Sequence, residues 1–396
     1  MRKRLLPFAL LLVVLAILLL LRASVVEPVT TPAVTAAAQP SRSPKPEPTP
    51  TPTPTPEPVS ADPAGERLAR MSVEDKALQM ILLCCNDPSA AAPAAARGVG
   101  GLCLYAASFA GKDAAGVIAM TSALQESAPI PLLLSVDEEG GTVCRVSRNP
   151  ALRARPFAAP RTVYAAGGGE GIESDTAEKA QLLLSLGLNV NMVPVCDVPP
   201  SLRSFIAPRS FSTDAAAVSE YAARVVGVMR EQGLGSVLKH FPGYGGSIDT
   251  HKGKAYDLRA YEVFEQRDFL PFRAGIEAGA DAVLVSHNIV KCMDGTQPAS
   301  LSPEVHRILR EELGFEGVVL CDDLSMGAIT KYTGGRNAAV QAVLAGNDLV
   351  CCGDCEAAAA AITAAVADGT IPEERLDESV LRILRWKLSL GLDISP

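Results

Sequence analysis

The sequence predicts a single (β/α)8 barrel of the TIM type, and three observations favour this fold class. Eight short apolar segments recur between residues 79 and 352, and each is continuously apolar rather than alternating. Continuous runs are typical of strands buried on both faces of a parallel sheet. Helical patterns separate most of the segments, and polar residues follow five of them, where a barrel would have its mouth. A doubly wound open sheet is the alternative that the same order of elements allows.

The first residues of the chain predict export. Leu5 to Leu21 is apolar apart from Pro7, and it follows three basic residues at positions 2 to 4. Positive charge keeps that end in the cytoplasm and sends the remainder across the membrane. The length lies between that of a signal-peptide core and that of a spanning helix. Residues 1–24 are therefore expected to be a membrane anchor facing the body outward, or a cleaved signal sequence that leaves a secreted protein.

Residues 25–60 are rich in proline and threonine, with proline at every second position from Pro44 to Pro58. Alternating proline fixes φ and removes amide donors, which predicts a disordered, extended linker. Residues 61–396 then form one domain. The chain has a net charge of −8, and the first 60 residues hold six basic and three acidic residues, so this domain carries about −11. We expect no nucleic-acid partner, and membrane contact only through residues 5–21.

Ten cysteines in an exported chain ordinarily suggest disulfides. Most of them lie inside apolar segments, however, where cysteine behaves as a small buried hydrophobe. We expect this of Cys84, Cys85, Cys103, Cys196, Cys321, Cys351 and Cys352. The C-x-x-C at 352–355 has no second pair at zinc spacing and no nearby histidine, so no metal site is predicted.

The elements follow in order along the domain. Ser72 and Asp75 have the spacing of a capping box and predict a helix over 73–79. The predicted strands are 79–85, 101–105, 131–137, 189–197, 236–241, 281–287, 317–323 and 347–352. The predicted helices between them are 114–125, 175–186, 214–232, 267–278, 303–313 and 337–345. His306, in one of these helices, is expected at the surface.

Polar residues at the strand ends indicate chemistry at the barrel mouth. They are Asp137, Asp197, Lys239 with His240, His287, and Asp322 with Asp323. The stretch KHFPGYGGSIDTH at 239–251 adds a glycine-rich loop that carries ionisable groups, a composition suited to movement. Together they predict acid–base and nucleophilic catalysis at the rim.

These motifs resemble glycoside hydrolase family 3, in particular its single-domain β-N-acetylhexosaminidase branch. The resemblance covers residues 66–392. It rests on DEEGGTVCR at 137–145, VNMVPVCDV at 190–198, APRSFS at 207–212, KHFPGYG at 239–245, PASLSP and LGFEGVV within 298–319, and CDDLSM at 321–326.

The resemblance implies roles for individual residues. Asp322 matches the family's nucleophile, a carboxylate that attacks the anomeric carbon and forms a glycosyl ester. Strand alternation alone does not choose between it and Asp323, which we expect to cap the next helix. His251 matches the acid/base, with Asp249 as its partner, because imidazole titrates near neutrality.

The resemblance also implies sugar-binding residues, whose charged groups make strong hydrogen bonds to hydroxyls. These are Asp137, Arg145, Arg209, Lys239 and His240, and His287 is expected to line the site as well.

The chain departs from the family pattern at several positions. Tyr244 stands where histidine is frequent, and the loop before His251 is one residue shorter. Glu138 replaces a frequent glutamine, and Thr142 replaces a frequent arginine. The shorter loop affects how far His251 can extend into the site. The change to Thr142 affects the outer part of the site.

The implied activity is that of a monomeric, retaining exo-β-N-acetylglucosaminidase without metal or cofactor. Its substrate would carry terminal N-acetylglucosamine, as in peptidoglycan fragments or related glycans. A phosphorylase is an alternative, since a histidine acid/base does not repel phosphate; a β-glucosidase of the family is another. From a different class, a tethered wall protein would bind sugar in the same pocket without turnover.

Overall fold

The computed structural model describes residues 62–246, 255–333 and 337–395. The predicted anchor, the predicted linker and the boundaries between them lie outside the described residues, and so do Asp249 and His251. No helix among the described residues combines the length and the apolar character that crossing a bilayer requires.

Eight parallel strands form the central sheet, in the order β10-β1-β2-β3-β4-β5-β7-β9. A bridge between Leu320 and Leu349 joins the two outer strands, so the sheet closes on itself. Every strand residue is buried, and every strand lies in a predicted apolar segment except that β5 begins one residue earlier, at Gly235. The barrel prediction is confirmed, and the open sheet is wrong. The strands are β1 Ile81–Cys85, β2 Gly101–Leu104, β3 Leu133–Val136, β4 Val190–Asn191, β5 Gly235–Phe241, β7 Ala282–Val285, β9 Val318–Cys321 and β10 Val350–Cys352.

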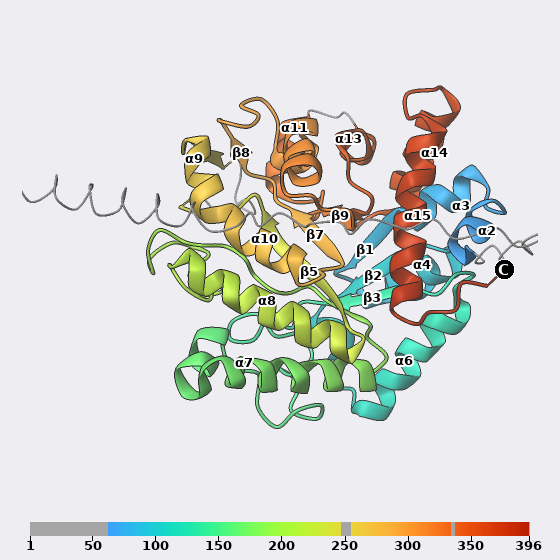
Figure 1. The fold of residues 1–396 in the computed structure, drawn as a ribbon. Helices are drawn as coiled ribbons and strands as arrows, with labels where there is room; N and C mark the ends of the chain where they lie inside the picture. Colours follow the sequence, from blue (N-terminus) through green and yellow to red (C-terminus); the bar gives the residue numbers. More distant parts are fainter. Residues whose placement is uncertain (1–61, 247–254, 334–336, 396) are drawn as a thin grey trace, which may run out of the picture. The chain divides into compact units, whose positions relative to one another are not determined.

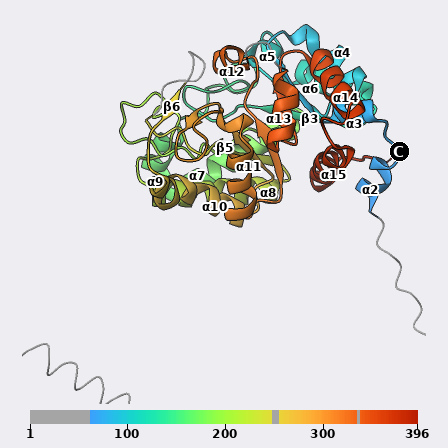
Figure 2. The same cartoon turned by 90° about the horizontal axis from the view of Figure 1, so that it is seen from above.

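Helices surround these strands on the outside (Figures 1 and 2). The capping box that begins α3 has both of its hydrogen bonds, between Ser72 and Asp75, as predicted. A short parallel pair, β6 Tyr256–Asp257 and β8 Ile289–Val290, joins the loops after β5 and β7. The main helices are α2 Pro63–Leu68, α3 Val73–Gln79, α4 Ala91–Arg97, α5 Ala106–Phe109, α6 Ala114–Ser127, α7 Pro160–Ser185, α8 Ala215–Gln232, α9 Tyr261–Val263, α10 Phe269–Glu277, α11 Pro303–Arg307, α12 Gly327–Thr333, α13 Ala338–Ala345, α14 Cys355–Ala367 and α15 Glu373–Ser389.

Helix α15 closes the amino-terminal end of the barrel. Its Trp386 borders a small interior cavity with Leu82, Leu133 and Leu320, and it lies against Gly235 at the start of β5. The site must therefore be sought at the carboxyl end, where parallel barrels carry their chemistry.

The cysteines form no disulfide; Cys292 is exposed, Cys355 is half-buried, and the other eight are buried. The core interpretation of the seven cysteines named above is therefore confirmed. The surface prediction for His306 is wrong, because this residue is 3% exposed. Its helix turns the imidazole toward Gly346 at the end of α13, and Nδ1 lies 2.8 Å from the Ser302 carbonyl oxygen.

Candidate active site

The predicted site residues follow neighbouring strands. Asp137 comes directly after β3, Lys239 and His240 lie within β5, His287 follows β7, and Asp322 follows β9. Because the strands are parallel, these positions meet at one mouth of the barrel. Arg145 and Arg209 reach the same mouth from the loops after β3 and β4, as their ion pairs show.

Lys239 is the centre of a buried charged cluster. Its Nζ lies 2.6 Å from Asp137 Oδ1 and 2.7 Å from Glu139 Oε1. The side chains of Lys239 and Glu139 are each 3% exposed. Burial lowers the pKa of Lys239, but the two carboxylates outweigh it and hold that pKa above its usual value. Lys239 is therefore a fixed cation at the mouth.

Arg209 joins this cluster from the other side. Its guanidinium binds Glu139 through Nε at 3.0 Å and Nη2 at 2.7 Å, a two-point geometry that only a planar fork can make. Burial raises the pKa of Glu139, but the charges of Lys239 and Arg209 outweigh burial and hold that pKa below its usual range. Glu139 is thus the anion that two cations share.

His240 extends the network inward. Arg209 Nη2 lies 3.1 Å from His240 Nε2, and His240 Nδ1 lies 2.6 Å from Asp197 Oδ2. A guanidinium has no acceptor, so Nε2 accepts and Nδ1–H donates to the carboxylate. Asp197 is fully buried and also accepts from the Tyr244 amide at 2.8 Å. The imidazole is therefore held in one tautomer and one orientation.

Arg145 completes the ring around Asp137, with Nη2 3.6 Å from Asp137 Oδ2. Its position depends on Glu138, which is fully buried and does not point to the mouth. The Glu138 carboxylate accepts from the amides of Arg145 at 2.8 Å and Val146 at 2.7 Å, and from the Ser147 hydroxyl. The departure from glutamine at this position thus supplies a charged acceptor that folds the loop behind Arg145.

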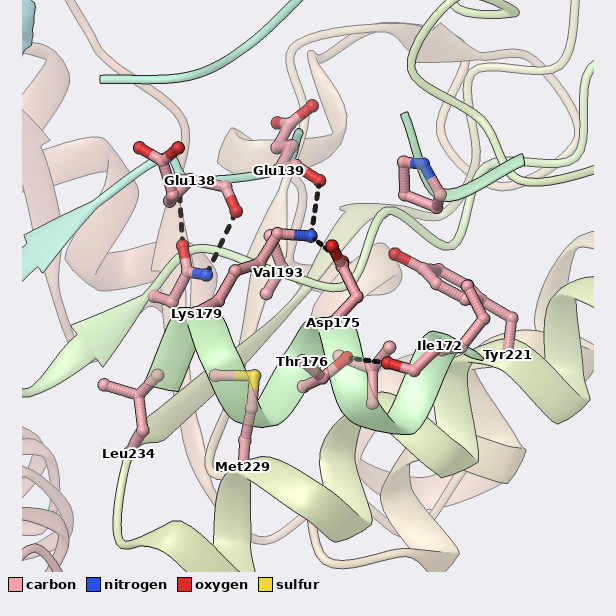
Figure 3. A pocket seen from close by; sticks show the side chains of 13 residues that line it. Glu138, Glu139, Ile172, Asp175, Thr176, Lys179, Val193, Tyr221, Met229 and Leu234 are labelled. Atoms are coloured by element: carbon pink, nitrogen blue, oxygen red, sulfur yellow. Dashed lines mark hydrogen bonds and ion pairs between the residues drawn. The ribbon is translucent and has the colours of Figure 1, made fainter. Parts of the chain in front are cut away.

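Lys179 from α7 supports the same loop from outside (Figure 3). Its Nζ donates to the Glu139 carbonyl oxygen at 3.3 Å and to Asp175 Oδ2 at 2.5 Å. The contact lies at a small cavity between α7 and α8, which is bordered by Thr176, Tyr221 and Met229 among others. The loop that carries Glu139 is therefore fixed by Arg209 on the side that faces the mouth and by Lys179 on the outer side.

The backbone of Asp322 continues the row of hydrogen bonds that joins β7 and β9. Its amide donates to the Val285 carbonyl oxygen at 2.9 Å, and its Oδ1 accepts from the Asp323 amide at 2.9 Å. The Asp323 carboxylate accepts from the Ser325 amide at 2.9 Å. Because α12 begins only at Gly327, Asp323 stabilises the preceding turn, and the prediction that it caps the helix is wrong.

His287 holds this turn. It is fully buried, and its Nε2 lies 3.0 Å from the Asp323 carbonyl oxygen while Nδ1 lies 2.7 Å from Ser300 Oγ. Because a carbonyl only accepts, Nε2 carries the proton. The structure gives His287 a positioning contact beside Asp322, and its predicted contact with sugar stays a prediction.

Tyr105 connects the charged cluster with the end of β9. Its ring centroid lies 5.3 Å from the Arg145 guanidinium carbon. Burial raises the pKa of its hydroxyl, and the charges of Asp137 and Asp323 raise that pKa further. Carboxylates from the ends of β3 and β9 thus act on one hydroxyl, which stays a proton donor.

Arg259 anchors the start of the glycine-rich loop. Its guanidinium donates to the Gly243 carbonyl oxygen at 3.1 Å and pairs with Asp257 at 2.7 Å and Asp268 at 2.8 Å. Gly243 has φ +115°, and a Cβ there would lie 2.7 Å from Asp268 Oδ1, so only glycine fits. The loop leaves β5 from a fixed point, while the roles of Asp249 and His251 stay predictions.

Sequence reasoning gave no site role to two central residues, Glu139 and Asp197. Glu139 lies two residues after Asp137 in the DEEGG motif, so both carboxylates can face one mouth; that spacing was the available signal. Asp197 was recognised at a strand end but not as the partner of His240. Among the described residues, no group of three or more histidine, cysteine or acidic side chains has the geometry to hold a metal ion.

A closed parallel barrel, a buried carboxylate–cation cluster at its mouth and a carboxylate at the tip of β9 are the features expected of a barrel glycoside hydrolase. The chain belongs to glycosyl hydrolase family 3, since residues 72–386 match the glycosyl hydrolase family 3 N terminal domain. This match confirms the family that the motifs suggested.

Individual relatives agree with the family assignment. A β-hexosaminidase of Xylella fastidiosa (strain M23) is 38% identical over 259 residues, which are 64% of this chain and 75% of the relative. The solved glycoside hydrolase family 3 β-N-acetylglucosaminidase of Paenibacillus sp. FPU-7 superposes with a TM-score of 0.75 at 31% identity, over 81% of this chain. The matched region is 63% of that longer protein. LpqI of M. tuberculosis gives a TM-score of 0.73 at 28% identity, over 83% of this chain and 96% of that one.

Proposed function

We propose that this glycoside hydrolase is a retaining exo-β-N-acetylglucosaminidase, within the β-N-acetylhexosaminidase activity that its relatives carry in their names. The observation that carries the proposal is the arrangement of charged residues at the mouth of the barrel. Asp322 stands at the tip of β9, at the same mouth as the charged ring of Asp137, Glu139, Lys239, Arg145 and Arg209, and such charged donors and acceptors suit the hydroxyl groups of a sugar.

In this proposal Asp322 attacks the anomeric carbon, and the leaving oxygen takes a proton from His251, which Asp249 orients. The bond to the leaving group breaks as the bond to Asp322 Oδ forms. Water, deprotonated by His251, then opens the glycosyl ester and restores the carboxylate with retained configuration.

The charged ring would hold the sugar. Of the three Lys239 N–H groups, Asp137 and Glu139 take one each, which leaves one donor for a hydroxyl. Asp137 has further lone pairs to accept from hydroxyls, and Arg209 has donors beyond those that bind Glu139. Because neither Lys239 nor Glu139 changes its charge near neutral pH, the sugar meets a preorganised site.

We further propose that the enzyme is exported and acts on N-acetylglucosamine-terminated peptidoglycan fragments. The apolar segment 5–21 behind three basic residues, and the proline-rich stretch after it, support export. Separating membrane from medium, followed by immunodetection of the body, distinguishes an anchored protein from a secreted one.

Turnover of 4-nitrophenyl glycosides tests the activity. We expect hydrolysis of N-acetyl-β-D-glucosaminide, slower cleavage of β-D-glucoside, and no dependence on phosphate. Faster cleavage of the glucoside would assign a β-glucosidase, whereas a sugar 1-phosphate formed only with added phosphate would assign a phosphorylase. Sugar binding without any turnover would assign the binding protein.

Variants test the residue roles. Asp322→Asn should lose several orders of magnitude in kcat, while Asp393→Asn, an exposed aspartate near the carboxyl terminus, should match wild type. His251→Ala should lose about 10²- to 10⁴-fold, and less on aryl leaving groups that need no proton. Unchanged hydrolysis by Asp322→Asn would place the nucleophile elsewhere. Peptide mapping of a trapped glycosyl adduct should locate it on the peptide that contains Asp322.

A further inference from the structure

We propose that Tyr105 is a positioning residue for the sugar site, and that its ring orients the Arg145 guanidinium toward the substrate. Tyr105 acts through Arg145 and is assigned no contact of its own with the sugar. The inference deepens the proposed function and rests on it, because Arg145 is one of the residues expected to bind the sugar.

Tyr105 lies at the barrel mouth, at the same level as Asp137. It directly follows β2, whose last residue, Leu104, is in register with Val136, the last residue of β3. The next residues along these two parallel strands are Tyr105 and Asp137. Tyr105 is half-buried, and its carbonyl oxygen accepts from the Ser108 amide at 2.9 Å. Its backbone therefore has a fixed position beside the charged ring.

The Arg145 guanidinium has donors that the protein does not satisfy. Its Nη2 lies 3.6 Å from Asp137 Oδ2, which is longer than a hydrogen bond. Its Nε is buried and has no hydrogen-bond partner among the residues that the structure describes. Buried donors without an acceptor are rare in proteins. An oxygen of a bound sugar would supply the acceptor, so we infer that these donors are kept for the substrate.

The Tyr105 ring supplies a contact that fixes Arg145 without using its donors. The ring centroid lies 5.3 Å from the guanidinium carbon, within the range in which a cation is attracted to a ring. Two other arginines that lie over rings, Arg153 and Arg259, also have carboxylate partners at 2.9 and 2.7 Å. Short ion pairs orient those two side chains, whereas Arg145 has only the ring and the long pair with Asp137.

The loops that carry Tyr105 and Arg145 are also fastened to each other. Asn149, four residues after Arg145, donates through Nδ2 to the carbonyl oxygens of Phe109 at 2.8 Å and Lys112 at 2.7 Å. Both acceptors lie in or shortly after α5, which begins directly after Tyr105. These bonds hold the ring and the backbone of Arg145 at a set spacing.

Substitutions at position 105 separate the ring from its hydroxyl. Tyr105→Leu should lower kcat/KM for 4-nitrophenyl N-acetyl-β-D-glucosaminide by about 2- to 30-fold, the range expected for loss of a cation–π contact. Tyr105→Phe keeps the ring and should recover most of that loss. Tyr164→Leu, which removes a 46% exposed tyrosine from α7, is the matched control and should equal wild type.

Two measurements distinguish orientation of Arg145 from a general loss of structure. In a double-mutant cycle, Tyr105→Leu should cost less than about twofold once Arg145→Ala is present, because the ring acts through the guanidinium. Phenylalanines that carry one, two or three fluorines at position 105 keep the ring shape while weakening the negative potential of its face. With Arg145 present, kcat/KM should fall with each added fluorine; with Arg145→Ala, it should stay constant.

Each alternative result counts against the inference. If wild type cleaves the N-acetylglucosaminide, and Tyr105→Leu keeps its kcat/KM or loses the same factor with and without Arg145, the inference is wrong while the proposed function stands. If Tyr105→Leu does not fold, the fluorinated series decides, and equal kcat/KM across that series would overturn the inference. If wild type cleaves no N-acetylglucosaminide, the proposed function and the inference fail together.

Discussion

Replacing Glu139 by glutamine would remove the anion at the centre of the charged ring. The Glu139 carboxylate accepts from Lys239 at 2.7 Å and from Arg209 at 2.7 and 3.0 Å. Glutamine has the same shape but no charge, and its amide NH₂ would face donors on one side. Removing one partner of a buried ion pair costs about 3 to 5 kcal/mol. Because two cations lose their shared anion here, we expect Glu139→Gln to lower the free energy of unfolding by at least about 3 kcal/mol.

Urea unfolding of the purified chain measures this loss, followed by circular dichroism at fixed protein concentration. Glu356→Gln is the matched control, because Glu356 pairs with Arg97 at 2.9 Å on the surface and such pairs contribute about 0 to 1 kcal/mol. Equal effects of the two substitutions would refute the claim that the charged ring is a buried, mutually dependent unit.

The pH dependence of the same difference gives a second check. The pKa of Glu139 lies below its usual range because the charges of Lys239 and Arg209 outweigh burial. Its stabilising contribution is therefore complete above the pKa of an unfolded glutamate and is lost as pH falls through the lower folded value. The pKa of Lys239 lies above its usual value despite burial, so its contribution is lost only in strong alkali. The difference between wild type and Glu139→Gln should stay constant from about pH 5 to 9.

Three further predictions concern residues other than Glu139 and Lys239. Burial and the nearby charge of Arg67 lower the pKa of Lys387 to about 7, so between pH 10 and 7 the unfolded chain binds a proton that the folded chain does not. As pH falls from 10 to 7, the free energy of unfolding of wild type should therefore decrease by about 4 kcal/mol relative to that of Lys387→Met. Urea unfolding at both pH values measures this difference. Glu138→Ala and Arg145→Ala should each lower kcat/KM by up to about 100-fold, and the double variant should lose little more, because one residue acts through the other. A chromogenic disulfide reagent should label one thiol of the native chain rapidly, and Cys292→Ser should abolish that phase without changing turnover.

The sequence predicted the strands better than the helices, for a physical reason. Parallel strands in a barrel are buried on both faces, so each one leaves an unbroken apolar segment that local reading finds. Helices α4 and α14 are built mostly of alanine, which gives little contrast between faces. The apolar periodicity of these two helices was therefore not recognised. Helix α15 differs, because Leu376, Val380, Ile383 and Leu384 are buried at helical spacing, so its pattern was present in the sequence and was overlooked.

The charged ring contains side-chain pairs that the local sequence pattern could not predict. Lys239 and Asp137 are 102 positions apart in sequence and 2.6 Å apart in space, and the strand-end rule alone predicted their meeting. The strand-end rule predicts which residues lie at the mouth of the barrel, but not which of them pair with each other. Glu139, which pairs with both Lys239 and Arg209, was therefore overlooked beside Asp137, and Asp197 was assigned no partner. Which side chains face each other depends on the register between strands, and that register follows from packing of the whole barrel.

A second cluster shows why the position in the barrel, and not charge alone, identifies the site. At the amino-terminal end, fully buried Asp348 lies 2.6 Å from Arg310, 3.2 Å from Arg382 and 3.5 Å from Arg375. Its composition, a buried carboxylate among guanidinium groups, resembles that around Glu139. Yet Asp348 also accepts from the Val319 amide at 3.0 Å and from the Ser379 hydroxyl at 2.7 Å, so it fastens α15 to the start of β9. Since Trp386 of α15 covers the interior at that end, the same chemistry serves stability at one end and, in the proposed function, substrate binding at the other.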